Sequence, residues 1–328
     1  MSFGGKLALS GLAGLAVFGL MAMLLDWRAT WSALGHLTAG WIPLILALAL
    51  GNYLFRFLKW HYYLRLVGVR LPVKESLAIY LSGFMMAVTP GKLGEVVKAF
   101  LIKRMTGVKM RVTAPVVLAE RITDVVALLV LSAAGAATLH YGQEALAAAA
   151  VLTALGIAAL SSRSLAMWGL GLCSRLPVLD RLEPKLREAY ESMAALLAPA
   201  PLLLGTAVSV PAWACEGVAF YLIFAGLQVP GTDFQGPPLL GAVFIYSFST
   251  LVGALSMLPG GLGAAEAGLA GLAVSLFAVP TGIAAAATLL VRLLTLWFAV
   301  ALGAATFAAF RLTFGVGFGE VDSVRREE

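Results

Sequence analysis

Two glycine-rich breaks interrupt the long apolar stretches of this chain. The first reads PGKLGE from Pro90 to Glu95, and the second reads PGGLGAAE from Pro259 to Glu266. Backbone that leaves a helix inside a bilayer is tolerated only where it is buried in protein or lines a wet cavity. Two such breaks at corresponding places are typical of membrane transporters built from internal repeats. The pair therefore predicts a membrane protein with two related halves.

The composition supports a membrane environment. Of 328 residues, 61% are hydrophobic and only 12% are charged, whereas a soluble domain has about 25% charged residues. Runs such as Leu7–Leu25 and Thr113–Leu139 are long enough for spanning helices of about 20 residues. Lys6 before the first run raises the alternative of a signal peptide, but Asp26-Trp27-Arg28 replaces a cleavage site and favours a span. We expect an all-α integral membrane protein.

The hydropathy pattern predicts six spanning helices and two interrupted segments. The spans are expected at 6–25, 40–60, 112–139, 143–162, 200–226 and 281–311. The interrupted segments are 74–88 with 92–105, and 238–257 with 262–278. Each half is too short to cross the bilayer, so each pair is predicted to be a re-entrant helical hairpin. Residues 1–312 then form one membrane domain, and 313–328 form a polar cytoplasmic tail.

Charge placement predicts the orientation and an inverted repeat. With a cytoplasmic N-terminus, most of the 23 basic residues fall on the cytoplasmic side, where the positive-inside rule expects them. Three spans separate the two hairpins, so the hairpins enter from opposite sides. The first repeat covers about 40–139 and the second about 200–311. Glu95 precedes Arg121 by 26 residues, and Glu266 precedes Arg292 by the same interval. The C-terminus is also placed on the cytoplasmic side.

Several classes of function are disfavoured by the sequence. The net charge of +6 is spread over short loops, which does not indicate nucleic-acid binding. Cys173 falls in a loop and Cys215 in a span, which argues against a disulfide. The sequence has no nucleotide-binding motif, no Ser/His/Asp nucleophile pattern and no Cys/His metal cluster. We therefore expect a protein without cofactors that is not an enzyme.

The segment 180–198 has the spacing of an amphipathic helix. Leu186, Tyr190, Met193 and Leu197 share one face, with charged residues opposite. Such a helix is predicted to lie on the cytoplasmic membrane surface. A connector helix packed on its own protein is an equally good interpretation.

Ionisable residues inside the apolar segments are the main candidates for a binding site. Each costs about 2.5–3.5 kcal/mol on insertion scales, so each is a functional hypothesis. Helices that begin within the membrane add unpaired N–H groups and a partial positive charge, and glycines allow close approach to the backbone. Together they predict a site for a phosphate or another anion. The candidates are Pro90, Gly91, Lys92, Gly94, Glu95, Glu120, Arg121, Asp124, Glu216, Pro259, Gly260, Gly261, Gly263, Glu266 and Arg292.

Structural roles are open alternatives for most of these charges. Glu120, Arg121 and Asp124 could form an ion pair between helices. Glu95 and Glu266 could cap helix starts. Glu216 could line a cavity or pair with Arg292 or Arg56. For Asn52, Arg56 and Lys59, near the end of their span, snorkelling is the favoured interpretation.

Three segments give the chain a resemblance to a known family. Residues 89–95, 120–124 and 258–263 with Glu266 resemble the lysylphosphatidylglycerol synthase transmembrane family, over about residues 10–312. The resemblance implies an inner-membrane protein that moves a lipid between leaflets. It also implies that the headgroup is surrounded by Lys92, Glu95, Glu120, Arg121, Asp124, Glu266 and Arg292. No segment resembles the soluble aminoacyl-transferase domain of the two-domain members, which leaves the lipid open.

Three functions are consistent with the sequence. The first is a lipid translocase for an anionic or aminoacylated phospholipid or a polyprenyl-linked lipid. The second is a secondary transporter of a small anion, coupled to protons through Glu95, Glu266 or Asp124. The third is a membrane transferase or an accessory subunit of a lipid-modifying enzyme. The expected partners are a membrane lipid and a separate lipid-synthesising enzyme, and a homodimer is left open.

Overall fold

The computed structural model describes residues 27–35, 37–88, 96–164, 183–227, 237–256 and 258–314. The predicted span at 6–25 and nearly all of the polar tail lie outside these residues. So does the whole first break, with Pro90, Gly91, Lys92, Gly94 and Glu95. Within the described part the regular structure is helical, and one isolated bridge joins Leu37 and Leu227.

The described residues form a series of helices. In chain order they are α2 (Trp27–Gly35), α3 (Ile42–Leu66), α4 (Val73–Gly83), α5 (Val96–Thr106), α6 (Met110–Leu139), α7 (Gln143–Ser161), α9 (Glu183–Leu196), α10 (Pro199–Gly226), α11 (Leu239–Leu255), α12 (Ala264–Phe277), α13 (Thr281–Arg292) and α14 (Phe298–Phe314). Three 3₁₀ turns are η1 (Ala39–Trp41), η2 (Phe84–Met86) and η5 (Pro259–Gly261), and η6 (Leu293–Trp297) is a π-helix.

Among the described residues, six helical segments are long and apolar enough to cross a membrane, which confirms the all-α membrane fold. They are Ala39–Leu66, Met110–Leu139, Gln143–Ser161, Pro199–Gly226, Pro259–Phe277 and Thr281–Leu312. Five coincide with predicted spans, but Pro259–Phe277 was predicted as half of a hairpin. It reaches 19 residues only with the η5 turn, where Gly260 has a φ of 62°, and α12 itself has 14 residues. Re-entrant insertion and an inverted repeat stay predictions.

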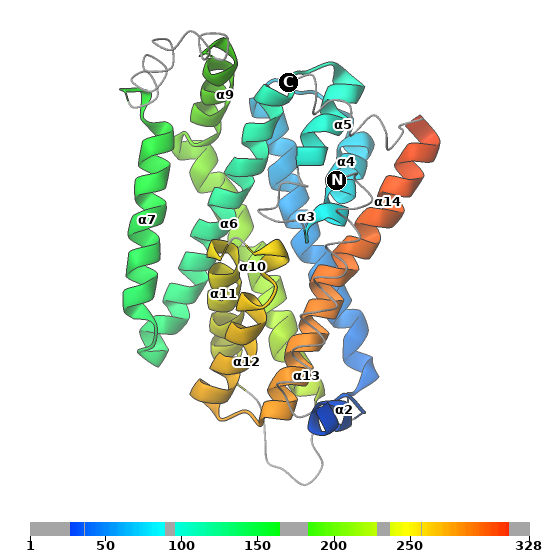
Figure 1. Ribbon diagram of the computed structural model, residues 1–328, viewed down its shortest axis with the longest axis vertical. Coiled ribbons are helices and arrows are strands. Elements are labelled where there is room, and N and C mark those ends of the chain that lie inside the picture. The colour runs from blue at the N-terminus through cyan, green and yellow to red at the C-terminus, as the bar shows by residue number, and fades with distance from the viewer. Residues whose placement is uncertain are drawn as a thin grey trace.

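The two interrupted segments lie towards opposite ends of the helix bundle (Figure 1). Helices α4 and α5 pack against each other near one end, and α11 and α12 pack against each other near the other. The long helix α6 contacts both α5 and α11. Among the described helices, the outer helix α7 packs mainly on α6 and α9.

The apolar interior is divided into two cores. The α11–α12 core includes Phe220, Phe244, Ile245 and Leu269. The α4–α14 core includes Trp60, Tyr80, Phe100 and Phe307. Several helices pass from one core to the other, and the border between the cores is here called the seam.

Polar residues of α6 lie at the seam. Ala119 belongs to the α4–α14 core and Ala127 to the α11–α12 core. Glu120, Arg121 and Asp124 lie between them in the sequence. We therefore expect the two cores to be held together only weakly across this polar layer, because buried polar groups contribute less net stability than apolar packing.

A π-helix joins α13 to α14 at the same level. Helix α13 packs on α12 and α2, whereas α14 packs on α4 and η2. The connecting segment η6 contains Thr295, which lines a cavity at the seam. Helical π segments occur frequently at functional sites and interrupt the regular hydrogen-bond ladder. The segment therefore connects two separately packed parts of the molecule.

Helix α9 packs on its own protein. Its last turn and the following residue bury Met193, Leu196 and Leu197 in the α4–α14 core. Arg111 Nε donates to Glu188 Oε2 over 2.5 Å, and its Nη2 donates to Oε1 over 2.9 Å. This guanidinium holds the pKa of the Glu188 carboxyl below its usual range. The connector interpretation describes these contacts, and the surface location of α9 stays a prediction.

The contact between α14 and η2 gives a first testable prediction. A Cβ atom at Gly303 would collide with backbone atoms of Leu81, Phe84 and Met85. A Gly303→Ala variant should therefore lose about 1–3 kcal/mol of stability, because backbone cannot give way cheaply. Thermal unfolding in detergent measures the loss. Gly156→Ala in α7 is the matched control, since nothing lies within 4 Å there, and an equal loss in both variants would contradict the prediction.

Candidate functional site

A cavity at the seam has polar side chains from several helices on its wall. It is lined by residues from α3, η2, α6, α10, α11, η5, α12, α13, η6 and α14. About 100 Å³ of it is open to a water-sized sphere. That space holds several waters or one group of phosphate size. The polar side chains on its wall are Tyr53, Arg56, Arg121, Glu216, Tyr246, Thr250, Arg292 and Thr295.

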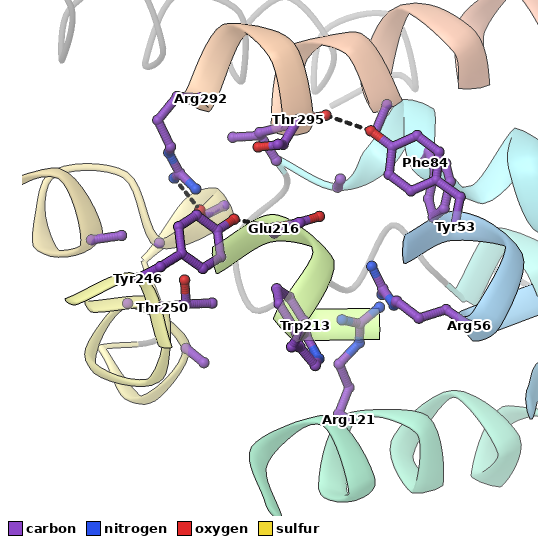
Figure 2. Close-up of a pocket in the computed structure, with 18 residues that line it drawn as sticks. Tyr53, Arg56, Phe84, Arg121, Trp213, Glu216, Tyr246, Thr250, Arg292 and Thr295 are labelled. Carbon is purple, nitrogen blue, oxygen red and sulfur yellow. Dashed lines mark hydrogen bonds between the residues drawn. The ribbon is translucent and has the colours of Figure 1, made fainter. Parts of the chain in front are cut away.

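Two of the three arginines approach the cavity from one side. Arg56 Nη2 lies 3.6 Å and Arg121 Nη1 lies 3.5 Å from Asp124 Oδ2. Figure 2 shows both side chains beside Trp213, whose ring centroid is 5.4 Å from the Arg56 Cζ atom. The carboxylate behind them fixes their positions while their guanidinium groups line the cavity. This side of the cavity is strongly cationic.

Asp124 also anchors a buried lysine. Lys59 Nζ donates to Asp124 Oδ1 over 2.7 Å, to Ser209 Oγ over 2.6 Å and to Thr123 Oγ1 over 3.0 Å. The Lys59 side chain is 1% exposed and Asp124 is 4% exposed. These bonds tie α3, α6 and α10 together. Neither Lys59 nor Asp124 is a wall residue of the cavity.

A second buried ion pair lies on the same turn of α6. Lys98 Nζ donates to Glu120 Oε2 over 2.7 Å. The ammonium group also lies 4.4 Å from the ring centroid of Trp60 and 5.2 Å from that of Tyr80. Charge pairing with two aromatic faces holds this lysine within the α4–α14 core. The pair connects α5 to α6 and does not reach the cavity.

Arg292 holds the second break in place. Its Nε donates to Glu266 Oε1 over 2.6 Å, and its Nη2 donates to the Gly260 carbonyl over 2.8 Å. Glu266 Oε2 accepts from the Gly263 N–H over 2.6 Å, which caps the start of α12. The predicted interval of 26 residues therefore joins two side chains in direct contact. Both the capping role of Glu266 and the cavity position of Arg292 are present.

Two tyrosines complete the wall. The Tyr246 hydroxyl donates to Glu216 Oε2, and the Tyr53 hydroxyl donates to the Thr295 carbonyl over 2.6 Å. The second bond supplies a partner to a carbonyl of the π segment. In Figure 2, Glu216 lies between Arg292 on one side and Arg56 with Arg121 on the other.

The second break lies against the described end of the first interrupted segment. A Cβ atom built on Gly260 would be 3.5 Å from the Val88 Cα atom. Val88 lies two residues before the first break in the sequence. The glycine at Gly260 therefore permits close approach of the two chain segments at the cavity.

Comparison with known proteins identifies the family. The family model for the lysylphosphatidylglycerol synthase TM region matches residues 7–303. The chain belongs to this family. Comparison with curated proteins gives no match. The resemblance found in the motifs is thus confirmed over nearly the whole chain.

In this member of the lysylphosphatidylglycerol synthase TM family, the predicted site residues fall into two described groups. Arg121, Glu216, Gly260, Gly261 and Arg292 line the cavity. The others stand behind the wall or beside it, and these are Glu120, Asp124, Pro259, Gly263 and Glu266. Asp124 and Glu120 form the structural ion pairs that the sequence analysis left open.

Several site residues were missed or misassigned. Arg56 and Lys59 do not snorkel, because both are buried and face Asp124. Their spacing with Asn52, at four and three residues, places all three on one helix face and could have indicated a shared polar face. Tyr53 and Tyr246 carry no such signal, since tyrosines are common throughout apolar helices.

Proposed function

We propose that this protein is a lipid translocase that moves a phosphate-bearing lipid between the leaflets of the inner membrane. The observation that carries the proposal is the cavity at the seam, whose described wall has three arginines and one carboxylate. Guanidinium groups bind phosphate oxygens through paired hydrogen bonds. Membership in the lysylphosphatidylglycerol synthase TM family supports a lipid-related membrane function.

The cavity volume supports a headgroup site with the lipid tails outside. The centre of a water-sized sphere can move through about 100 Å³ of the cavity, which is room for a phosphate group. The tails would remain in the hydrocarbon of the membrane during transfer. Only the charged group then needs a protein environment, and this is the part whose transfer through hydrocarbon is costly.

The division into two cores supports a rocking mechanism. The part containing α11, α12 and α13 would tilt against the part containing α4, α5 and α14. The π segment η6 is the proposed hinge between α13 and α14. Tilting at the seam would open the cavity to one leaflet and then to the other, as in other alternating-access proteins.

The orientation and partners are part of the same proposal. The helix ends at one end of the bundle have several exposed basic residues, including Arg65, Arg70, Lys74 and Arg104. We assign this end to the cytoplasm by the positive-inside rule. The proposed partner is the lipid itself, supplied by a separate lipid-synthesising enzyme, and the protein would break and form no covalent bond.

Transport of lipid can be tested in proteoliposomes. Phosphatidylglycerol with a fluorescent acyl chain should change leaflets faster than in protein-free vesicles, as measured by dithionite quenching. A fluorescent glucosylceramide, which has no phosphate, is the control and should stay near the protein-free rate. Equal rates for both lipids, or no acceleration of the phospholipid, would contradict the proposal.

A transporter of small soluble anions is the second candidate. The small volume of the cavity favours it, because a free anion of phosphate size fills the space alone. Uptake of dimethyl phosphate into the same proteoliposomes distinguishes the two. Uptake without lipid transfer would support the second candidate, and lipid transfer without uptake supports the first.

A further inference from the structure

Glu216 differs from the other buried acids of the described residues. Asp124 pairs with Lys59, Glu120 with Lys98 and Glu266 with Arg292, each within 2.7 Å. Glu216 accepts a hydrogen bond from the Tyr246 hydroxyl and forms no ion pair with a described cation. Among the described residues it is also the carboxylate that lines the cavity, and it is 6% exposed.

The groups that face Glu216 come from every helix packed around that part of α10. On the cavity wall they are Tyr53 and Arg56 from α3, Arg121 from α6, Tyr246 from α11, Arg292 from α13 and Thr295 from η6, and Asp124 of α6 adds a negative charge from behind the wall. The other elements that contact α10, which are η1 and α9, contribute no residue to the cavity wall. Figure 2 shows Glu216 near the middle of this set.

Protonation has different consequences at the different acids. A proton on Asp124 or Glu266 would leave Lys59 or Arg292 buried beside a neutral group, which is strongly unfavourable. A proton on Glu216 breaks no ion pair. It removes the negative charge from a wall that also has three arginines, so the cavity becomes more positive by one charge. An anion in the cavity is then bound more tightly.

We propose that Glu216 is a proton-binding site coupled to anion binding in this cavity. One proton converts the Glu216 carboxylate to the carboxylic acid as one phosphate-bearing anion enters. The proton leaves the acid again when the anion departs to the other side. Tyr246 acts as a positioning residue that orients Glu216 Oε2 towards the phenol. The proposal rests on the proposed function, because it requires an anion in the cavity.

Such coupling determines the direction in which a proton gradient drives transport of the anion. Proton and anion bind together, so a proton gradient drives the anion in the direction in which protons flow. The sequence analysis placed proton coupling on Glu95, Glu266 or Asp124. The ion pairs of Glu266 and Asp124 make these two poor proton carriers, and Glu95 lies outside the described residues.

Binding of defined anions across pH tests the proposal. The full-length protein in detergent is titrated calorimetrically with dioctanoyl phosphatidylglycerol, from about pH 5 to about pH 9. A second arm uses dimethyl phosphate, a soluble diester with the same charge, to separate a headgroup site from a free-anion site. Neither probe titrates in this range. Wild-type affinity should fall by up to about tenfold per pH unit above a midpoint.

The variant Glu216→Gln should bind independently of pH, at the affinity that the wild type has at low pH. At high pH its affinity should exceed wild type by about 10- to 100-fold, as expected for removing one charge at an effective dielectric constant of about 20. Tyr246→Phe should keep the slope and move its midpoint to higher pH, because the ionised carboxylate loses a donor. Glu144→Gln, an exposed acid on α7, is the control and should behave as wild type.

The outcomes separate the two proposals. Tight wild-type binding that does not change with pH, or an unchanged slope in Glu216→Gln, overturns the proton site and leaves the anion site standing. Absence of binding for both probes at every pH overturns the anion site and the translocase together. An unshifted midpoint in folded Tyr246→Phe also counts against the proton site.

Discussion

An Asp124→Asn variant should lose about 3–5 kcal/mol of its free energy of unfolding. The carboxylate is the shared partner of Lys59 at 2.7 Å, Arg121 at 3.5 Å and Arg56 at 3.6 Å. Removing its charge leaves three cations near one another in the bundle interior. Denaturation midpoints in detergent, compared with the wild type, measure the loss.

Two comparisons separate this effect from a general sensitivity to lost acids. Glu191→Gln removes an exposed carboxylate that lies 3.9 Å from Arg187, and its effect should stay within about 1 kcal/mol. Adding Lys59→Met to Asp124→Asn removes the most buried cation and should recover part of the loss. A wild-type midpoint for folded Asp124→Asn would show that the ion pairs contribute little.

The spanning helices could be predicted because hydropathy acts over whole segments. Five predicted spans agree with the described helices to within a few residues, apart from the longer C-terminal end of α3. The segment after Pro259 shows the limit of this method. Its length depends on whether the η5 turn is counted, and that turn exists because Gly260 adopts a positive φ. Composition alone does not determine such a break.

The residues of the candidate site could be predicted as a set, but which of them contact one another could be predicted only in part. The equal interval from each glutamate to its arginine was interpreted as the register of a repeat, and in the second half it joins two side chains in direct contact. The contact of Lys59 with Asp124 joins residues 65 positions apart and depends on how α3 packs on α6. No local pattern in either helix encodes that packing.

The position of a charge, and not its presence, therefore decides its role. Glu120 and Arg121 are neighbours in the sequence, yet one faces Lys98 in the α4–α14 core and the other lines the cavity. Adjacent residues on a helix point about 100° apart. The sequence predicts both residues in the same polar cluster. Only the packing of the surrounding helices shows which residue stabilises the fold and which lines the candidate binding site.

An Arg292→Gln variant should slow phospholipid transfer by about 30- to 5000-fold in the proteoliposome assay. Truncating one partner of a buried charge contact costs about 2–5 kcal/mol, and Arg292 is proposed to contact the phosphate from the cavity wall. Its other contacts, to Glu266 and the Gly260 carbonyl, hold the second break. Loss of transfer could therefore arise from the charge or from the shape of the break.

The variant Glu266→Gln distinguishes these causes. It removes the ion pair, which lowers the stability of the protein, but leaves the guanidinium and its bond to the Gly260 carbonyl available. Transfer per folded molecule should therefore stay within about fivefold of wild type. Arg65→Gln, an exposed arginine at the basic end of α3, is the control for the number of charges. Equal losses in Glu266→Gln and Arg292→Gln would assign Arg292 to supporting the break. A loss of transfer per folded molecule that is confined to Arg292→Gln assigns Arg292 to binding the phosphate.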